Sequence, residues 1–172
     1  MKKKIVLITC CRKKKCDHRP RPARDIYCAE RFVAEREYAE RVGGDDGWFI
    51  LSAKHKLLSP KAEIESYDQT LSNDNEKKAW GETVFNVLAK KFAPHTHEFI
   101  ILNDEGDYCK FLKPLLRLAG FRTHCPVEVL EKNEAIECVK YLNELEQDGV
   151  GVTPLFSSPA DERKNPTLPS GS

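Results

Sequence analysis

Three polar side chains that can do chemistry follow the second apolar run of the chain. Ser52, Lys54 and His55 come directly after the run 48–51. The serine and nearby main-chain amides can hold a phosphate, the lysine can neutralise its charge, and the imidazole can polarise the carbonyl of a nucleobase. The alternative is an ordinary turn that the serine caps, with a solvated lysine and histidine.

Two further groups combine a carboxylate with a neighbour that binds bases or sugars. Tyr67 could stack on a nucleobase, which is worth about 1–3 kcal/mol per base, or it could pin a long loop to the core. Asp68 could orient water or stabilise positive charge on a ribose, or it could begin a turn. Asn103 and Asp104 follow the apolar run 99–102, where an acid is well placed for catalysis in α/β folds. Asp104 could equally cap the helix that follows.

A basic segment follows the first apolar run. Residues 1–24 are rich in lysine and arginine and contain one acid, Asp17. Amides and cations at the end of a strand suit a phosphate, so Cys10, Arg12, Lys13 and Lys14 are candidate phosphate contacts. The alternative is a solvated basic loop. The segment lacks the glycine-rich pattern of a P-loop or a dinucleotide turn, which disfavours ATP and NAD.

The cysteines indicate reduced thiols rather than a disulfide or metal framework. There are seven, an odd number, and no secretion signal is visible. Cys10, Cys11 and Cys16 lack the paired C-x2-C spacing of a structural zinc site. We therefore expect no metal and no cofactor, and a thiol-based redox or metal module is the weakest of the functional hypotheses.

Composition favours one globular domain. The chain has 172 residues with 40% hydrophobic and 32% charged residues, and its formal net charge is +1. No apolar run is long enough to span a membrane, so we expect a cytoplasmic protein without membrane contact. Residues 150–172 are rich in proline and serine, and we expect a disordered tail there, after a folded domain over 1–149.

Alternating strand and helix patterns predict how these residues are positioned. Apolar runs predict strands at 4–9, 48–52, 98–102 and 121–126, and helical periodicity covers 26–42, 73–92, 106–119 and 133–147. We expect a three-layer α/β/α sandwich with a mainly parallel, Rossmann-like sheet. Ligands of such folds lie beyond the carboxyl ends of the strands. Arg24 and Tyr27 could close that cleft from the first loop, and Tyr108 could face it.

Three local patterns add detail. In the helix at 26–42 an apolar stripe is surrounded by charged residues, among them Arg31 and Glu35. The connection 53–75 has no clear periodicity, and loops of this length in compact domains are usually functional or disordered. The pair Asn73 and Glu76 matches a capping box at the start of the next helix.

The stretch 49–60 (FILSAKHKLLSP) and the stretch 64–68 (IESYD) resemble the YaaA-like proteins. Further matches are the run Cys11-Arg-Lys-Lys14, the helix opened by Tyr27, and Gly106-Asp-Tyr108. The resemblance extends over about residues 5–142. Lys56 stands where the group usually has Gly, and Ser66 where it usually has Pro.

The resemblance implies a nucleic-acid- or nucleobase-handling α/β domain. Our leading hypothesis is a glycosylase-like protein that cleaves or handles an N-glycosidic bond. Its partner would be a nucleic acid, DNA in the first instance, or a nucleotide, with Asp104 or Asp68 stabilising an oxocarbenium-like state and His55 as polariser. The alternative is a non-catalytic DNA-binding stress-response protein of the YaaA type, which would show salt-sensitive binding without turnover.

Overall fold

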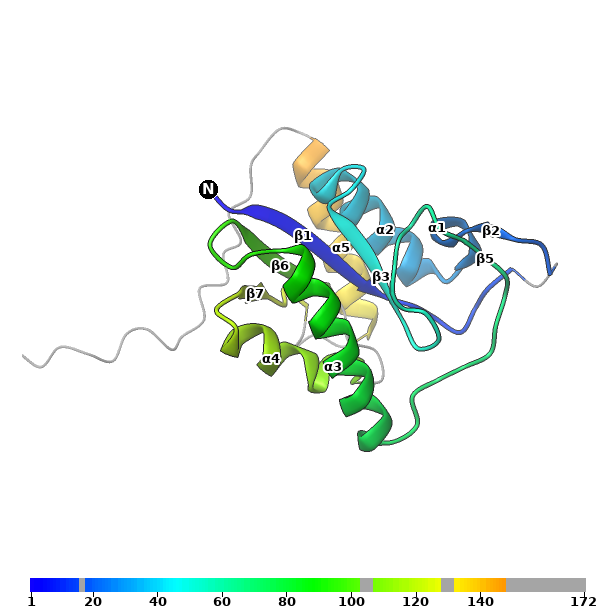
Figure 1. Ribbon diagram of the computed structural model, residues 1–172. Helices are drawn as coiled ribbons and strands as arrows, with labels where there is room; N and C mark the ends of the chain where they lie inside the picture. The colour runs from blue at the N-terminus through cyan, green and yellow to red at the C-terminus, as the bar shows by residue number, and fades with distance from the viewer. Residues whose placement is uncertain (16–17, 103–106, 128–131, 148–172) are drawn as a thin grey trace, which may run out of the picture.

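The computed structural model describes residues 1–15, 18–102, 107–127 and 132–147 (Figure 1). Asn103, Asp104 and the expected tail lie outside these residues. Within the described helices, none is long and apolar enough to cross a membrane.

A five-stranded, mostly parallel sheet forms the centre of this mixed α/β fold. Its order is β4 (Lys56–Leu58), β3 (Trp48–Ser52), β1 (Lys3–Thr9), β6 (His97–Ile101) and β7 (Arg122–His124). The strands β3, β1, β6 and β7 are parallel to one another, and β4 is antiparallel to β3. The predicted strands and the mainly parallel sheet are thus confirmed.

Two apolar clusters hold the helices against the sheet. Alternate residues of β1 enter different clusters: Val6 and Ile8 enter one, Ile5 and Leu7 the other. The first cluster contains residues of α2 (Glu30–Gly43) and α5 (Lys132–Gln147), and the second contains residues of α3 (Asp74–Lys91) and α4 (Leu112–Leu118). In Figure 1, α2 and α5 lie together, apart from α3 and α4. The apolar run 5–8 within β1 fits this arrangement because both faces of the strand are buried there.

The chain between β1 and α2 differs from the expected continuous helix at 26–42. A short helix, α1 (Ala23–Ile26), ends at Tyr27, which is extended and pairs with Lys14 in an isolated bridge. The longer helix α2 begins only at Glu30. Tyr27 is therefore not a helical residue but the point where the basic segment is tied to the body of the protein.

The placement of Arg31 and Glu35 corrects a second expectation. Both were expected among the charged residues around the apolar stripe of α2, yet their side chains are only 3% and 2% exposed. They form an ion pair of 2.6 Å between Arg31 Nη1 and Glu35 Oε2. Pairing with each other is what makes burial of the two charges possible.

The connection 53–75 contains two short strands that the sequence did not indicate. β4 forms a tight hairpin with β3, and β5 (Glu63–Ile64) pairs antiparallel with β2 (Arg21–Pro22). Lys56, at the end of the hairpin turn, has a φ of 62° in the left-handed region. That conformation suits glycine, which has no Cβ to clash in the left-handed region.

The capping box before α3 is formed in a modified version. The side chain of Asn73 accepts a hydrogen bond of 3.0 Å from the Glu76 amide, as predicted. The Glu76 carboxylate accepts from the Ser72 amide at 2.8 Å, which extends the box by one residue. The helix expected at 106–119 is described as a 3₁₀ turn, η1 (Tyr108–Lys110), followed by α4, with Pro114 in the first turn of α4.

Candidate functional site

The carboxyl ends of β1 and β3 lie side by side and bring the first two candidate segments together. Thr9 pairs with Leu51, and the Cys10 amide donates to the Leu51 carbonyl at 2.9 Å. Because the two strands are parallel, the residues that follow them emerge at the same edge of the sheet. The basic segment and the β3–β4 hairpin therefore begin next to each other.

Three hydroxyl groups meet at this edge. The Tyr67 hydroxyl lies 2.7 Å from Ser52 Oγ and 2.7 Å from the Tyr27 hydroxyl. Ser52 Oγ also accepts from the His55 amide at 2.9 Å, so the serine caps the hairpin turn. Ser52 and Tyr27 are buried. We call these three residues the hydroxyl cluster. It joins the end of β3, the residue that follows α1 and the loop before α3.

The phenols of the hydroxyl cluster stay neutral. Burial is the largest cause that raises the pKa of Tyr27 and of Tyr67, and for Tyr67 the neighbouring Cys10 and Tyr27 raise it further. A neutral phenol can both donate and accept a hydrogen bond, which the short contacts require. The hydroxyl cluster therefore holds the segments that contain Tyr27, Ser52 and Tyr67 together.

Cations and an imidazole surround the ring of Tyr67. Lys14 Nζ lies 4.3 Å from the ring centroid and Lys54 Nζ lies 5.6 Å from it. The His55 ring meets Tyr67 edge-on, with centroids 5.2 Å apart. These contacts support the anchoring interpretation of Tyr67, because a base could stack on its ring only after Lys14 had moved away.

His55 is a neutral side chain at neutral pH. Burial lowers its pKa from the ordinary value of 6.5, and the charges of Lys54 and Lys56 lower it further. Its Nε2 is buried and has no hydrogen-bond partner among the described residues. A neutral imidazole can polarise a carbonyl, which is the role that the sequence suggested, but it does not supply a positive charge.

A groove of about 660 Å³ opens beside the hydroxyl cluster. We call it the basic groove; it is lined by Arg12, Lys14, His18, Ser66, Tyr67, Asp68 and Thr70. Cations from the basic segment form one part of its wall, and the loop before α3 supplies the Asp68 carboxylate. The groove thus combines the two features that the sequence predicted, cations from one segment and a carboxylate from another.

Several other predicted residues lie elsewhere. Lys13 is exposed, and its carbonyl accepts from the Cys28 amide at 3.0 Å. Arg24 lines a different cavity with Glu40. The Tyr108 hydroxyl accepts from the Leu71 amide at 3.3 Å, in the apolar cluster of α3 and α4.

The buried pair of Arg31 and Glu35 is a positioning element that the sequence reasoning missed. Arg31 donates to the Cys10 carbonyl at 3.2 Å and to the Thr9 carbonyl at 3.4 Å, so it holds the end of β1. The i,i+4 spacing of opposite charges was a visible signal. That spacing is also common on exposed helix faces, so it does not distinguish a buried pair from an exposed one. The contact with β1 shows that this pair is buried.

The thiol of Cys11, beside the site, gives no sign of activation. Burial raises the pKa of the Cys11 thiol, although the Ala29 amide and Arg31 partly oppose this. Its Sγ donates to the Lys13 carbonyl at 3.2 Å. A raised thiol pKa reduces the thiolate fraction, which disfavours redox chemistry at Cys11. Within the described part of the chain, no three His, Cys, Asp or Glu side chains lie close enough to bind a metal ion.

Comparison with known families shows to which family the chain belongs. The model of DUF6884, described as a family of unknown function, matches residues 5–141. The chain belongs to the DUF6884 family. No curated protein and no solved structure matches the chain. The matched range includes most of β1, residues 10–24, the hydroxyl cluster and the loop before α3, so the DUF6884 region contains the whole candidate site.

Proposed function

We propose that this DUF6884 protein binds a nucleic acid or a nucleotide in the basic groove. The observation that carries the proposal is the convergence of Arg12, Lys14 and His18 on one groove at the carboxyl edge of a parallel sheet. A phosphate would be held by the two permanently charged side chains of this group, and DNA is the first candidate among polymers. The resemblance to the YaaA-like proteins supports the same class of ligand. We take the overall arrangement to be a three-layer, Rossmann-like sandwich, a common framework for such sites.

Lys14 has a specific part in this proposal. Its ammonium group lies over the Tyr67 ring and also lines the groove. A phosphate competes well for an ammonium group because a charge-assisted hydrogen bond is stronger than an exposed cation–π contact. Movement of Lys14 towards a phosphate would uncover Tyr67, whose ring would then be open to a base.

The catalytic version of the proposal assigns N-glycosidic bond cleavage to the same groove. The Asp68 carboxylate would stabilise the oxocarbenium-like sugar or activate a water molecule, and neutral His55 would polarise the departing base. Asp104 keeps the same candidate role from the segment after β6. Water attack at the sugar carbon would release the free base and leave a hydroxyl on that carbon.

Release of free bases from DNA and from nucleotides tests the catalytic version. We expect turnover by the wild type, at least a tenfold decrease for Asp68→Asn or Asp104→Asn, and a smaller decrease for His55→Ala. Asp45→Asn is the matched control. Asp45 lies in an exposed turn and does not line the basic groove, so the rate should be unchanged. Absence of release with every substrate, or equal rates for all variants, would refute the catalytic version.

A non-catalytic DNA-binding protein of the stress-response type is the second candidate. The observation that favours it is the internal use of the polar groups: the hydroxyls of Ser52, Tyr67 and Tyr27 bond to one another. This version predicts binding that weakens steeply with salt, with no chemical change in the DNA.

A further inference from the structure

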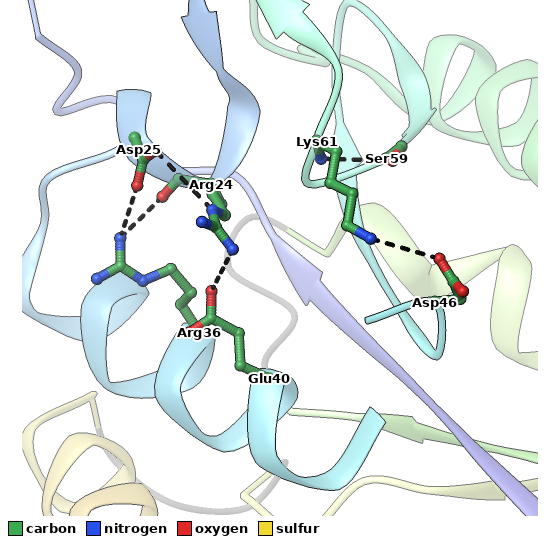
Figure 2. Close-up of polar contacts among 7 residues, drawn as sticks. All are labelled: Arg24, Asp25, Arg36, Glu40, Asp46, Ser59 and Lys61. Carbon is green, nitrogen blue, oxygen red and sulfur yellow. Dashed lines mark hydrogen bonds and ion pairs between the residues drawn. The ribbon is translucent and has the colours of Figure 1, made fainter. Parts of the chain in front are cut away.

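A second cavity, separate from the basic groove, lies between the start of α1, the end of α2 and the turn after β4. Its volume is about 210 Å³, and it is lined by Arg24, Glu40, Gly44, Asp45, Trp48, Pro60 and Lys61. None of these residues lines the basic groove. Figure 2 shows Arg24 and Glu40 facing each other at one side, with Lys61 and Asp46 at the other.

The backbone around this cavity is fixed by hydrogen bonds. The Arg24 amide donates to the Pro60 carbonyl at 3.0 Å, which joins α1 to the turn after β4. The Gly44 amide donates to the Glu40 carbonyl at 3.0 Å and closes the end of α2. Trp48 and Pro60 are buried and supply apolar lining. The cavity is therefore preformed rather than dependent on a mobile segment.

The charged side chains at its rim are only loosely paired. Arg24 Nη1 lies 3.6 Å from Glu40 Oε1, and Lys61 Nζ lies 3.6 Å from Asp46 Oδ1. Charge-assisted N–H···O hydrogen bonds are shorter, about 2.7–2.9 Å. The donors of Arg24 and Lys61 and the carboxylate of Glu40 can therefore take a ligand without first breaking a short bond, and Asp45 adds a second carboxylate to the lining.

The balance of charge decides the class of ligand. Two cations and two carboxylates line the cavity, so a simple anion would face two carboxylates and a simple cation would face two ammonium or guanidinium groups. A dipolar ligand with one charge of each sign meets complementary groups at both ends. The volume lies below the roughly 300–1,000 Å³ of sites for drug-sized ligands, which limits the ligand to about the size of an amino acid.

We propose that this cavity binds a free amino acid with a small apolar side chain. The ligand carboxylate meets Arg24 and Lys61, its ammonium group meets Glu40 and Asp45, and its side chain lies over Trp48 and Pro60. Because the charged side chains are partly exposed, the expected Kd is on the order of 1 mM. This inference does not depend on the function proposed for the basic groove.

Isothermal titration of the full chain with L-valine tests the proposal. We expect saturable binding of L-valine, and binding at least about tenfold weaker for N-acetyl-L-valine and for L-valinamide, which each lack one of the two charges. Arg24→Gln and Lys61→Gln, on separate segments, should each weaken binding several-fold, as should Glu40→Gln. Lys90→Gln and Glu82→Gln, exposed on α3, are the matched controls and should bind as the wild type does.

The possible outcomes separate the alternatives. Absence of saturable L-valine binding overturns the proposal, and so does equal binding of the two capped compounds. Binding of inorganic phosphate in preference to L-valine would show an anion site instead and would also overturn it. Circular dichroism and thermal unfolding of each variant confirm that a loss of binding does not reflect a loss of fold.

Discussion

At the scale of single residues, the hydroxyl cluster explains how a long loop without periodicity becomes part of a defined site. The Tyr67 hydroxyl contacts those of both Ser52 and Tyr27, and its ring contacts Lys14. One side chain thus fixes the position of three segments. Loss of its hydroxyl would leave two buried hydroxyls with one partner fewer.

Tyr67→Phe tests this role. We expect the free energy of unfolding to fall by about 1–3 kcal/mol, because buried polar groups lose hydrogen bonds while the ring is kept. Urea denaturation measures the change. Tyr141→Phe, at a tyrosine that is 58% exposed, is the control and should have little effect. An equally small effect at both positions would show that the cluster does not anchor the loop.

A substitution at Lys56 is expected to raise the free energy of unfolding rather than lower it. Its left-handed φ of 62° costs a non-glycine residue about 1–2 kcal/mol, while glycine in the unfolded chain costs about 0.5–1 kcal/mol in entropy. Lys56→Gly should therefore raise the free energy of unfolding by up to about 1.5 kcal/mol. Lys54→Gly, in the same turn at negative φ, should lower it. Destabilisation by both changes would contradict the described turn.

At the scale of the elements, α2 has a polar contact with the end of β1 in addition to its apolar face. The buried pair of Arg31 and Glu35 holds the carbonyls of Thr9 and Cys10, where the basic segment begins. A buried ion pair contributes little net stability compared with apolar residues, but removal of one partner leaves an uncompensated charge. The pair therefore specifies the geometry of the first loop more than it stabilises the fold.

Replacement of one or both residues of this pair separates the two effects. Arg31→Met alone should lower the free energy of unfolding by about 3–5 kcal/mol, because the buried Glu35 carboxylate loses the positive charge of Arg31. The double variant Arg31→Met/Glu35→Leu should recover most of that loss. Equilibrium unfolding of the three proteins measures it, and a double variant no more stable than Arg31→Met would refute the account of the pair.

The sequence was most informative about elements whose own pattern determines their structure. β1, β3, β6 and α5 were predictable because their apolar patterns match the faces they bury. The start of α2 and the strands β4 and β5 were not, because they depend on pairing between distant segments, such as Arg21 with Ile64. For the same reason the sequence placed Tyr67 and Lys14 in one site but not in contact, and it assigned Arg24 to that site rather than to a cavity of its own.

At the scale of the whole molecule, the charges are distributed unevenly along the chain although the net charge is small. The formal net charge is +1, yet cations gather on the basic segment and line one groove with Asp68. A local basic face on a nearly neutral protein favours contact with phosphates while limiting non-specific attraction over the rest of the surface. The central claim is that this groove, and not net charge, binds a nucleic acid.

Salt-dependent binding of single-stranded and duplex DNA tests this claim most directly. Fluorescence anisotropy with labelled oligonucleotides would compare the wild type, Arg12→Glu/Lys14→Glu, and the control Lys78→Glu/Lys90→Glu, which makes the same change in net charge on α3. We predict that wild-type affinity falls linearly with salt on a logarithmic scale, that the groove variant loses affinity and about two phosphate contacts from the slope, and that the control matches the wild type. Equal losses in both variants, or no binding by the wild type at low salt, would contradict the account.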